Sequence, residues 1–366
     1  MINVEEYCSF DDALIEPNFS NVIPTEVNLM TKLTKSIVLH TPIISAPMDT
    51  VTEHNMAINM ALNGAIGVIH KNLDINLQCY EVSKVKNYVI DSAKYNKPCI
   101  DEKGALRVLA AISTGEEALR RLDALIKVNV DAIVIDTSHG YSQNVLSTIT
   151  AIKSRFANVE IIAGNVVTKN AAFALLEAGV DALKVGIGPG SICTTRIIAG
   201  VGFPQLSAIL EVAKACKNKE ASLIADGGIR FSGDIAKSIA AGADCVMLGS
   251  LLAGSDVSPG KVVSINNLKY KEYRGMGSAK AMAFGSADRY FQTVKANLVP
   301  QGVEGYVRYK GALKNILSDL SGGLSCAMGY TGNKTIAEMK KNCRLIKITP
   351  ASIKESHAHS VVRLDQ

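Results

Sequence analysis

Residues 182–196 read Ala-Leu-Lys-Val-Gly-Ile-Gly-Pro-Gly-Ser-Ile-Cys-Thr-Thr-Arg. An apolar run typical of a strand ends at Gly186, and a loop containing Gly188 and Gly190 then delivers Cys193. Glycine lets the backbone take conformations closed to other residues and come close to a ligand. The stretch is either a strand-to-helix turn that happens to hold a cysteine or a ligand-binding loop that presents a nucleophile.

Eight short apolar runs recur along the chain, with helical patterns between them. Continuous apolar runs predict strands buried on both faces, as in a parallel sheet covered by helices. Strand alternating with helix eight times predicts a (β/α)8 TIM barrel, a doubly wound open sheet being the alternative. The 366 residues suffice for one such catalytic domain, 1–366. The predicted strands are 42–47, 65–70, 106–113, 131–138, 160–166, 182–188, 222–228 and 245–250, and the predicted helices include 116–128, 142–156, 169–178, 205–216 and 233–241.

Composition narrows the class of protein. The hydrophobic content of 48% indicates a well-buried core, and a net charge of +5 without a dense basic run disfavours general nucleic-acid binding. No apolar stretch of about 20 residues predicts a membrane span, and the first residues lack the pattern of a signal peptide. Eight scattered cysteines without a Cys-x-x-Cys pair predict free thiols in a reducing cytoplasm.

The barrel prediction requires chemistry to gather where the strands end, because the carboxyl ends of the strands form the active face of such barrels. Polar residues do follow the predicted strands, and the segments ending at Arg230 and Ser250 follow the last two, where phosphate sites often lie. Any one of these residues can be a turn or a helix cap, but together at one rim they predict an active site. They include Ser45, Asp49, His70, Asp136, Ser138, His139, Asn165, Cys193, Asp226 and Ser250.

Two segments lie outside the predicted barrel wall. Residues 89–104 form a short polar linker between the second and third strands. Residues 255–330 form a long, glycine-rich insertion after the eighth strand. Because a long loop at the active face is commonly a lid, we expect 255–330 to provide an active-site loop and a mobile flap.

Six stretches together carry a specific resemblance: SAPMDTVTE (45–53), GVIHKN (67–72), AGNV (163–166), GIGPGSICTTR (186–196), ADGGIR (225–230) and YRGMGS (273–278). Through them the chain resembles the inosine monophosphate dehydrogenase and guanosine monophosphate reductase family over nearly its whole length. That family typically carries two regulatory CBS modules between the second and third barrel strands. Here only the linker 89–104 joins those strands, so the resemblance is to a form without CBS modules and without allosteric control through them.

The family has two branches, of which only the dehydrogenase needs a water-activating flap. DRYFQ (288–292), LVPQGVEGYVRYKG (298–311) and IIAGVGFPQ (197–205) resemble the dehydrogenase branch. The favoured interpretation is therefore oxidation of IMP to XMP with NAD+ and water. The alternatives are a GMP reductase, which converts GMP and NADPH to IMP and ammonia, and a catalytically silent nucleotide- or nucleic-acid-binding protein.

The resemblance implies a role for each site residue. Cys193 is the implied nucleophile, whose thiolate attacks C2 of the purine and forms a covalent thioimidate once a hydride has left. Arg289 and Tyr290 on the flap, with Thr195, are implied to bring the water that hydrolyses this intermediate. IMP itself is expected at Ser191, Asp226, Gly228, Gly249, Ser250, Tyr273, Gly275, Met276, Gly277 and Gln301.

The resemblance also implies a cofactor, a metal ion and an assembly. NAD is expected along Asp136, Ser138, Asn165, Gly186 and Gly188. K+ is expected on backbone carbonyls of the cysteine loop, completed by the C-terminal segment 350–366 of a neighbouring subunit, which implies a homotetramer. The expected K+ residues are Gly188, Gly190, Cys193, Glu355, Ser356 and His357.

Overall fold

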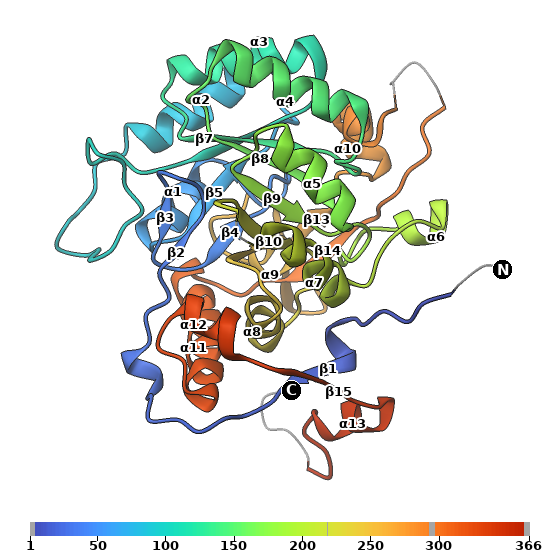
Figure 1. Ribbon diagram of the computed structural model, residues 1–366. Coiled ribbons are helices and arrows are strands. Elements are labelled where there is room, and N and C mark those ends of the chain that lie inside the picture. The colour runs from blue at the N-terminus through green and yellow to red at the C-terminus, as the bar shows by residue number, and fades with distance from the viewer. Residues whose placement is uncertain (1–3, 218, 293–296, 362–366) are drawn as a thin grey trace.

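The computed structural model describes residues 4–217, 219–292 and 297–361. Eight parallel strands close into a barrel at the centre of the molecule (Figure 1), which confirms the predicted fold class. Each strand lies inside one of the predicted apolar runs. In their order around the barrel the strands are β10 (Ser222–Asp226), β11 (Cys245–Leu248), β4 (Ile43–Ser45), β5 (Ile66–Ile69), β6 (Leu109–Ile112), β7 (Ala132–Asp136), β8 (Ile161–Val166) and β9 (Ala182–Val185).

Burial explains why these runs form strands. Every residue of the eight barrel strands is buried except Asp226, which is half-buried at the end of β10. Strands enclosed by helices outside and by packed side chains inside gain most from continuous apolar sequence. Lys184 is the exception within β9, since its side chain is fully buried in the barrel.

Helices cover the outside of the barrel. In α3, for example, Ala118, Leu122 and Leu125 form the buried face, while glutamates occupy the first turn and Lys127 the last, in agreement with the helix dipole. The outer helices are α1 (His54–Leu62), α2 (Ile75–Lys86), α3 (Gly115–Lys127), α4 (Gln143–Arg155), α5 (Lys169–Glu177), α7 (Gln205–Cys216), α8 (Ser232–Ala240) and α11 (Leu313–Thr331).

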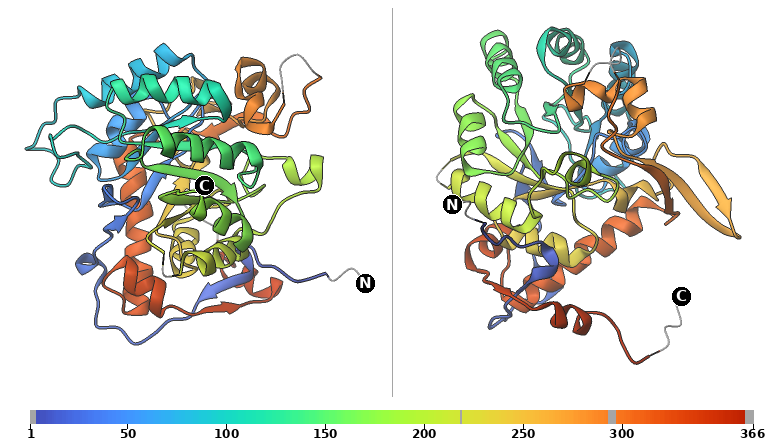
Figure 2. Two further views of the ribbon diagram at one scale, coloured as in Figure 1. Left: turned by 45° about the horizontal axis from the view of Figure 1, so that its top comes forward. Right: turned by 90° about the vertical axis from the view of Figure 1, so that its right-hand side faces the viewer.

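The insertion after β11 contains its own small sheet. Strands β12 (Val262–Ile265), β13 (Leu268–Arg274) and β14 (Glu304–Arg308) are antiparallel, and the β12–β13 hairpin projects from the body of the molecule (Figure 2, right). Between β13 and β14 lie α10 (Ala279–Phe284) and the 3-10 helix η3 (Ser286–Tyr290). Residues 293–296 of this part lie outside the described residues.

The expected range of the flap, 255–330, is too long at its C-terminal end. Helix α11 begins at Leu313 and packs against α8 and α1, so it closes the ring of outer helices rather than belonging to the flap. Its apolar face, with Leu317, Leu320 and Leu324 buried, gives the physical reason. The part of the insertion outside the barrel wall therefore ends near residue 312.

Segments near the two termini pack together beside the barrel. Strand β1 (Ala13–Ile15) pairs antiparallel with β15 (Leu345–Lys347), and α13 (Pro350–Glu355) follows (Figure 1). No helix in the described part of the chain is long and apolar enough to cross a bilayer. The remaining elements are η1 (Phe10–Asp12), η2 (Pro24–Glu26), β2 (Thr31–Lys32), β3 (Val38–Leu39), α6 (Thr195–Ala199), α9 (Ser250–Ala253) and α12 (Ile336–Asn342).

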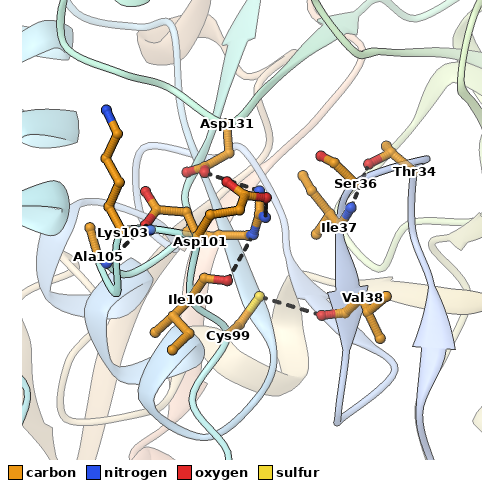
Figure 3. Close-up of polar contacts among 12 residues, drawn as sticks. Thr34, Ser36, Ile37, Val38, Cys99, Ile100, Asp101, Lys103, Ala105 and Asp131 are labelled. Carbon is orange, nitrogen blue, oxygen red and sulfur yellow. Dashed lines mark hydrogen bonds and ion pairs between the residues drawn. The ribbon is translucent and has the colours of Figure 1, made fainter.

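The end of the predicted linker 89–104 lies near the starts of the barrel strands, since Cys99 contacts the Val38 carbonyl and the Ile100 carbonyl accepts a hydrogen bond from Arg107. The Asp101 carboxylate accepts hydrogen bonds from the backbone N–H groups of Lys103 and Ala105, both at 2.9 Å, and so forms a tight turn (Figure 3). The Lys86 ammonium lies 2.9 Å from both Asp101 and Asp131. These contacts fasten the end of the linker to the barrel.

Candidate active site

A cavity of about 350 Å³ opens at the carboxyl ends of the barrel strands. Loops after several strands and the insertion after β11 together form its wall. Most residues that the sequence singles out line this one cavity. They are Asp136, Ser138, Asn165, Gly186, Gly188, Gly190, Ser191, Cys193, Thr195, Asp226, Gly228, Gly249, Ser250, Tyr273, Gly275, Met276, Arg289, Tyr290 and Gln301.

Gly277, the C-terminal residues and four of the predicted rim residues do not line the cavity; these four are Ser45, Asp49, His70 and His139. Gly277 lies directly behind it, because a Cβ added there would stand 2.7 Å from the ring of Tyr290. Glu355, Ser356 and His357 are exposed at the end of α13, and His357 packs edge-on to Phe231. Within one chain, the two halves of the expected K+ set are thus not brought together. Among the described residues, no group of three or more His, Cys, Asp or Glu side chains is placed to hold a metal ion.

Backbone pairing fixes the loop that carries Cys193. The N–H of Thr194 donates to the carbonyl of Gln301 at 2.9 Å, and the N–H of Val303 donates to the carbonyl of Ile192 at 3.0 Å. The Cys193 N–H donates to Gly190 at 3.1 Å, which closes a tight turn just before the thiol. The loop after β9 is therefore held against the insertion, and the thiol has a defined position at the cavity wall.

The surroundings of Cys193 differ from those of the deeply buried cysteines. Cys193 is half-buried, and its Sγ lies 3.2 Å from the Oγ1 of Thr195. Burial raises the pKa of the Cys99 thiol to about 12 and that of the Cys245 thiol well above its usual value, so both stay protonated. Those two are inert members of the hydrophobic interior, whereas Cys193 faces an open cavity where a thiolate can react.

Gly186 is required where β9 gives way to the loop. Its φ is +144°, and a Cβ at this position would stand 2.1 Å from the carbonyl oxygen of Asp226. Only glycine fits so close to a neighbouring strand. The residue therefore lets the cysteine loop leave β9 directly beside the end of β10.

Arg289 lies deep in the cavity and forms a bidentate ion pair with Asp136. Its Nε is 2.7 Å from one carboxylate oxygen and its Nη2 is 3.0 Å from the other. The backbone N–H of Ser138 also donates to the Arg289 carbonyl at 2.9 Å. The η3 segment is thus docked on the loop after β7, and it occupies two of the residues expected to meet the dinucleotide.

The pKa values of this pair follow from its close contact. Burial raises the pKa of Asp136, but Arg289 and then Lys184 outweigh burial and hold it well below its usual range. Burial lowers the pKa of Arg289, but Asp136 outweighs it and holds the value above the usual range. Burial also raises the pKa of the Tyr290 hydroxyl, opposed by Arg289 and reinforced by nearby Cys193. Arg289 thus pairs with Asp136, and Tyr290 lines the same cavity as Cys193.

Lys184 connects the two ends of the site. Its ammonium lies 2.8 Å from Asp136 and 2.8 Å from Asp226, and it also donates to the side-chain oxygen of Asn165. The Asn165 amide donates in turn to Asp226 at 2.9 Å and to the Gly186 carbonyl at 2.6 Å. The charge of Lys184 therefore balances two carboxylates that belong to different expected subsites.

Tyr273 and its neighbours form another part of the cavity wall. Burial raises the pKa of the Tyr273 hydroxyl to about 12, partly offset by a hydrogen bond with Ser191, so the hydroxyl stays protonated and can donate. A Cβ added to Gly249 would stand 2.9 Å from this hydroxyl. A donor, a serine and a glycine backbone thus meet at one place, which suits an anionic group.

The ion pairs at the rim were not expected from the sequence. Arg274 forms a bidentate pair with Asp49 at 3.0 and 2.8 Å, and Lys71 pairs with Asp288 of the flap segment. A usable signal existed for Lys184, since a lysine inside an apolar strand must find a carboxylate partner. No comparable signal marks Lys71, whose partner is 217 residues away.

The barrel, its cysteine loop and the insertion after β11 define the class of the protein. The family model described as the IMP dehydrogenase / GMP reductase domain matches residues 7–359, and the chain belongs to this family. It is 47% identical to an inosine-5'-monophosphate dehydrogenase of Borreliella burgdorferi over 98% of both chains. It is 46% identical to that of Cryptosporidium parvum, over 98% of this chain and 96% of the relative.

A third relative bears on the missing modules. The inosine-5'-monophosphate dehydrogenase of Aquifex aeolicus is 40% identical over an alignment of 471 positions, which covers 98% of this chain and 96% of the relative. That alignment is longer than the 366 residues of this chain, so the Aquifex protein has segments without a counterpart here. The difference agrees with a family form that lacks an inserted domain.

Proposed function

We propose that the protein oxidises IMP to XMP, with NAD+ as hydride acceptor and water as the source of the new oxygen. Membership of the family allows either the dehydrogenase or the reductase reaction, and the names of the similar relatives favour the dehydrogenase. The structural observation that carries the proposal is the meeting of Cys193 and Thr195 with Arg289 and Tyr290 in one cavity. A reductase has no need of the last two at the nucleophile.

Cys193 acts as the nucleophile in this proposal. Its thiolate adds to C2 of the purine, and a hydride then leaves C2, so that a thioimidate links the sulfur to the ring. Covalent catalysis divides one difficult oxidation into two easier steps. The half-buried position of the thiol at the cavity wall supports this role.

Hydrolysis of the thioimidate falls to Thr195 and the docked flap residues. Water adds to C2 and loses a proton to solvent, the thiolate leaves, and XMP is released. We assign to Arg289 the orientation of this water, because Asp136 keeps its guanidinium charged in the docked arrangement. Accepting a proton would require Arg289 to separate from Asp136 first. Thr195, whose Oγ1 lies 3.2 Å from the Cys193 sulfur, and Tyr290, which lines the same cavity, complete the hydrogen bonds to the water.

IMP is proposed to lie between the cysteine loop and β13. Ser191, Gly249 and Tyr273 offer donors for its phosphate, and the half-buried Asp226 carboxylate can accept two hydrogen bonds from the ribose hydroxyls. Backbone groups of 275–277 and Gln301 would meet the base. The remaining proposed contacts are Gly228, Ser250, Gly275, Met276 and Gly277.

NAD+ fits the side of the cavity that Arg289 now occupies. Asp136 accepts two hydrogen bonds from the guanidinium, and the same two oxygens suit a ribose diol once Arg289 has left. When bound there, the nicotinamide accepts the hydride from C2. Asp136, Ser138, Asn165, Gly186 and Gly188 are the residues proposed to hold the dinucleotide, which makes dinucleotide and docked flap mutually exclusive.

We propose that the cysteine loop supplies part of a K+ site. Carbonyl oxygens of Gly188, Gly190 and Cys193 suit a hard cation, and the φ of +85° at Gly188 bends this loop sharply. We propose that exposed Glu355, Ser356 and His357 of a neighbouring copy complete the ligand set, within a homotetramer. Sedimentation in K+ buffer tests this assembly, and a monomer under those conditions would contradict it.

The cellular setting follows from the cysteines. All eight are free thiols in the structure, and Cys193 must stay reduced to react. We therefore propose that the enzyme works in the reducing cytoplasm.

Nicotinamide absorbance distinguishes the two family reactions. The expected result is NADH formation from IMP and NAD+, with no oxidation of NADPH in the presence of GMP. Turnover of GMP with NADPH and none of IMP with NAD+ would replace the dehydrogenase by the reductase. No turnover with either pair would favour a silent nucleotide-binding protein.

A further inference from the structure

We propose that Lys71 is a positioning residue that holds the flap segment Ser286–Tyr290 in its docked place through an ion pair with Asp288. The proposal rests on the proposed function, because docking matters only if Arg289 and Tyr290 act on a Cys193 adduct. Lys71 belongs to the stretch GVIHKN, for which the mechanism above has no use. It gives that stretch a task in the hydrolytic half of the reaction.

The ion pair joins a fixed element to the insertion. Lys71 follows β5 in the barrel wall, and Asp288 precedes Arg289 in η3. The Lys71 side chain is 6% exposed and that of Asp288 is 43% exposed. In the described part of the chain, Asp288 is the one hydrogen-bond or ion-pair partner of the Lys71 ammonium.

Asn72, the residue after Lys71, also contacts the docked part of the insertion. The Asn72 amide donates to Asp49 at 2.7 Å and reaches the Ala281 carbonyl of α10 at 3.5 Å. At Gly285, where α10 gives way to η3, φ is +138°, and an added Cβ would stand 3.2 Å from the Asn72 side-chain oxygen. Lys71 and Asn72 therefore contact both Asp288 within the flap segment and the residues that lead into it.

Because Lys71 is more deeply buried than Asp288, breaking the ion pair costs more free energy at the lysine than at the aspartate. If the η3 segment lifts away, Asp288 passes into water, where its charge is well solvated. The Lys71 ammonium stays in the barrel wall, and an unpaired charge there is costly. Lys71 consequently favours the docked arrangement, in which Arg289 pairs with Asp136 and Tyr290 lines the same cavity as Cys193.

The consequence for turnover follows from the shared use of Asp136. Arg289 and the dinucleotide are proposed to compete for this carboxylate, so weaker docking slows hydrolysis without weakening NAD+ binding. In Lys71→Met, which keeps the bulk of the side chain and removes its charge, kcat should fall about tenfold, or about 1.4 kcal/mol in the barrier. The rapid NADH burst of the first turnover should keep its rate, and KM for NAD+ should not rise.

Three further variants separate positioning from loss of structure. Lys71→Arg keeps the charge and should recover most of the lost kcat. The exchange Lys71→Asp with Asp288→Lys restores a pair of opposite charges and should be more active than Lys71→Asp alone. Lys280→Met removes another lysine of the insertion, whose ion pair with Glu304 at 3.0 Å is solvent-exposed, and should leave kcat and the burst unchanged.

A reporter that needs no turnover tests the docking itself. The chain contains no tryptophan, so Phe291→Trp, next to Tyr290, places a single one at the end of the segment. In a Cys193→Ala background, adding Lys71→Met should shift the Trp emission to the red and increase its quenching by acrylamide. Adding Lys280→Met should change neither.

The outcomes distinguish the positioning role of Lys71 from the proposed IMP dehydrogenase function. Absence of NADH formation in the parent protein would remove the proposed function, while the Trp reporter would still test the docking. Equal Trp quenching with and without Lys71→Met would overturn the proposal that Lys71 holds the segment Ser286–Tyr290 in place. A KM for NAD+ that rises in step with the fall of kcat would place Lys71 in the dinucleotide site instead, which also overturns it.

Discussion

Strand β7 has a buried aspartate at each end, and each bridges a lysine and an arginine. At the amino-terminal end, Asp131 lies 2.9 Å from Lys86 and 3.3 Å from Arg107, and it accepts the N–H of Val108 at 2.8 Å (Figure 3 shows this end of the barrel). These partners belong to α2 and to the approach to β6. All of them are fixed parts of the barrel.

At the carboxyl end of β7, Asp136 also bridges a lysine and an arginine, but the arginine comes from the insertion after β11. Asp136 pairs with Lys184 of β9 at 2.8 Å and with Arg289 of the insertion at 2.7 and 3.0 Å. The two aspartate side chains are almost equally buried, at 5% and 4% exposed. What differs is that one partner of Asp136 belongs to a segment outside the barrel wall.

The pKa directions of the two carboxyls differ as well. Burial raises the pKa of Asp131 and outweighs Lys86, whereas Arg289 and Lys184 outweigh burial and lower the pKa of Asp136. The bidentate contact with Arg289 is the closer of the two arginine contacts. The proposed function gives the two Lys–Asp–Arg bridges different tasks: the one at the carboxyl end docks a segment of the insertion at the site, and the one at the amino-terminal end joins fixed parts of the barrel.

The largest expected effect comes from replacing one cysteine at each end of the barrel by alanine. Cys193→Ala should reduce turnover at least about 10³-fold, because the nucleophile is lost, while the free energy of unfolding stays unchanged. Cys99→Ala, at the linker, should do the reverse and cost about 1 kcal/mol of stability by opening a small cavity. Steady-state rates and urea unfolding measure both. A fully active Cys193→Ala protein would show that the nucleophile is wrong.

A smaller effect should separate the two aspartates themselves. Asp136→Asn should lower kcat by about tenfold or more, since Arg289 loses the carboxylate that docks it. Asp131→Asn should leave kcat unchanged and destabilise the protein by about 1–3 kcal/mol, because Lys86 and Arg107 lose a buried partner. The two variants are compared by initial rates and by urea unfolding. Equal losses of activity in the two variants would contradict the different roles assigned to Asp136 and Asp131.

The pH dependence of stability should differ in sign between the same variants. Asp136, with its lowered pKa, contributes stability that is present above the unfolded pKa of about 3.9 and is lost below it. Asp131, with its raised pKa, binds its proton more readily when folded, so acidification favours the folded state at this site.

Urea unfolding between pH 7 and pH 3 tests these signs. Asp136→Asn should lose less stability on acidification than the parent protein, and Asp131→Asn should lose more. The same sign of change in both variants would mean that one of the two pKa directions is wrong.

Much of the barrel was predictable from the sequence. Each strand lies within a predicted apolar run because burial on both faces imposes apolar residues on nearly every position. Helix α7 has the predicted bounds of 205–216, and the other predicted helices are shifted by one residue at most at each end. The limit of the insertion was wrong, since glycines at 322, 323 and 329 lie inside α11 and imitate the composition of a loop.

The contacts within the site were predictable only in part. The glycine-rich loop marks Cys193 locally, but the pairing of Lys71 with Asp288 joins residues 217 positions apart. Lys184 sits in a run that reads as apolar strand, and its two carboxylate partners are revealed only by the closed barrel. Local pattern thus predicts where polar groups stand along the strands, and the fold alone decides which of them meet.

Mass spectrometry of a quenched reaction tests the central claim most directly. Protein mixed with IMP and NAD+ should carry a nucleotide adduct on the peptide that contains Cys193. Arg289→Ala should accumulate more of this adduct, because its hydrolysis is slowed while hydride transfer continues. An Arg289→Ala protein that forms NADH in a first turnover with no mass added at Cys193 would contradict the account.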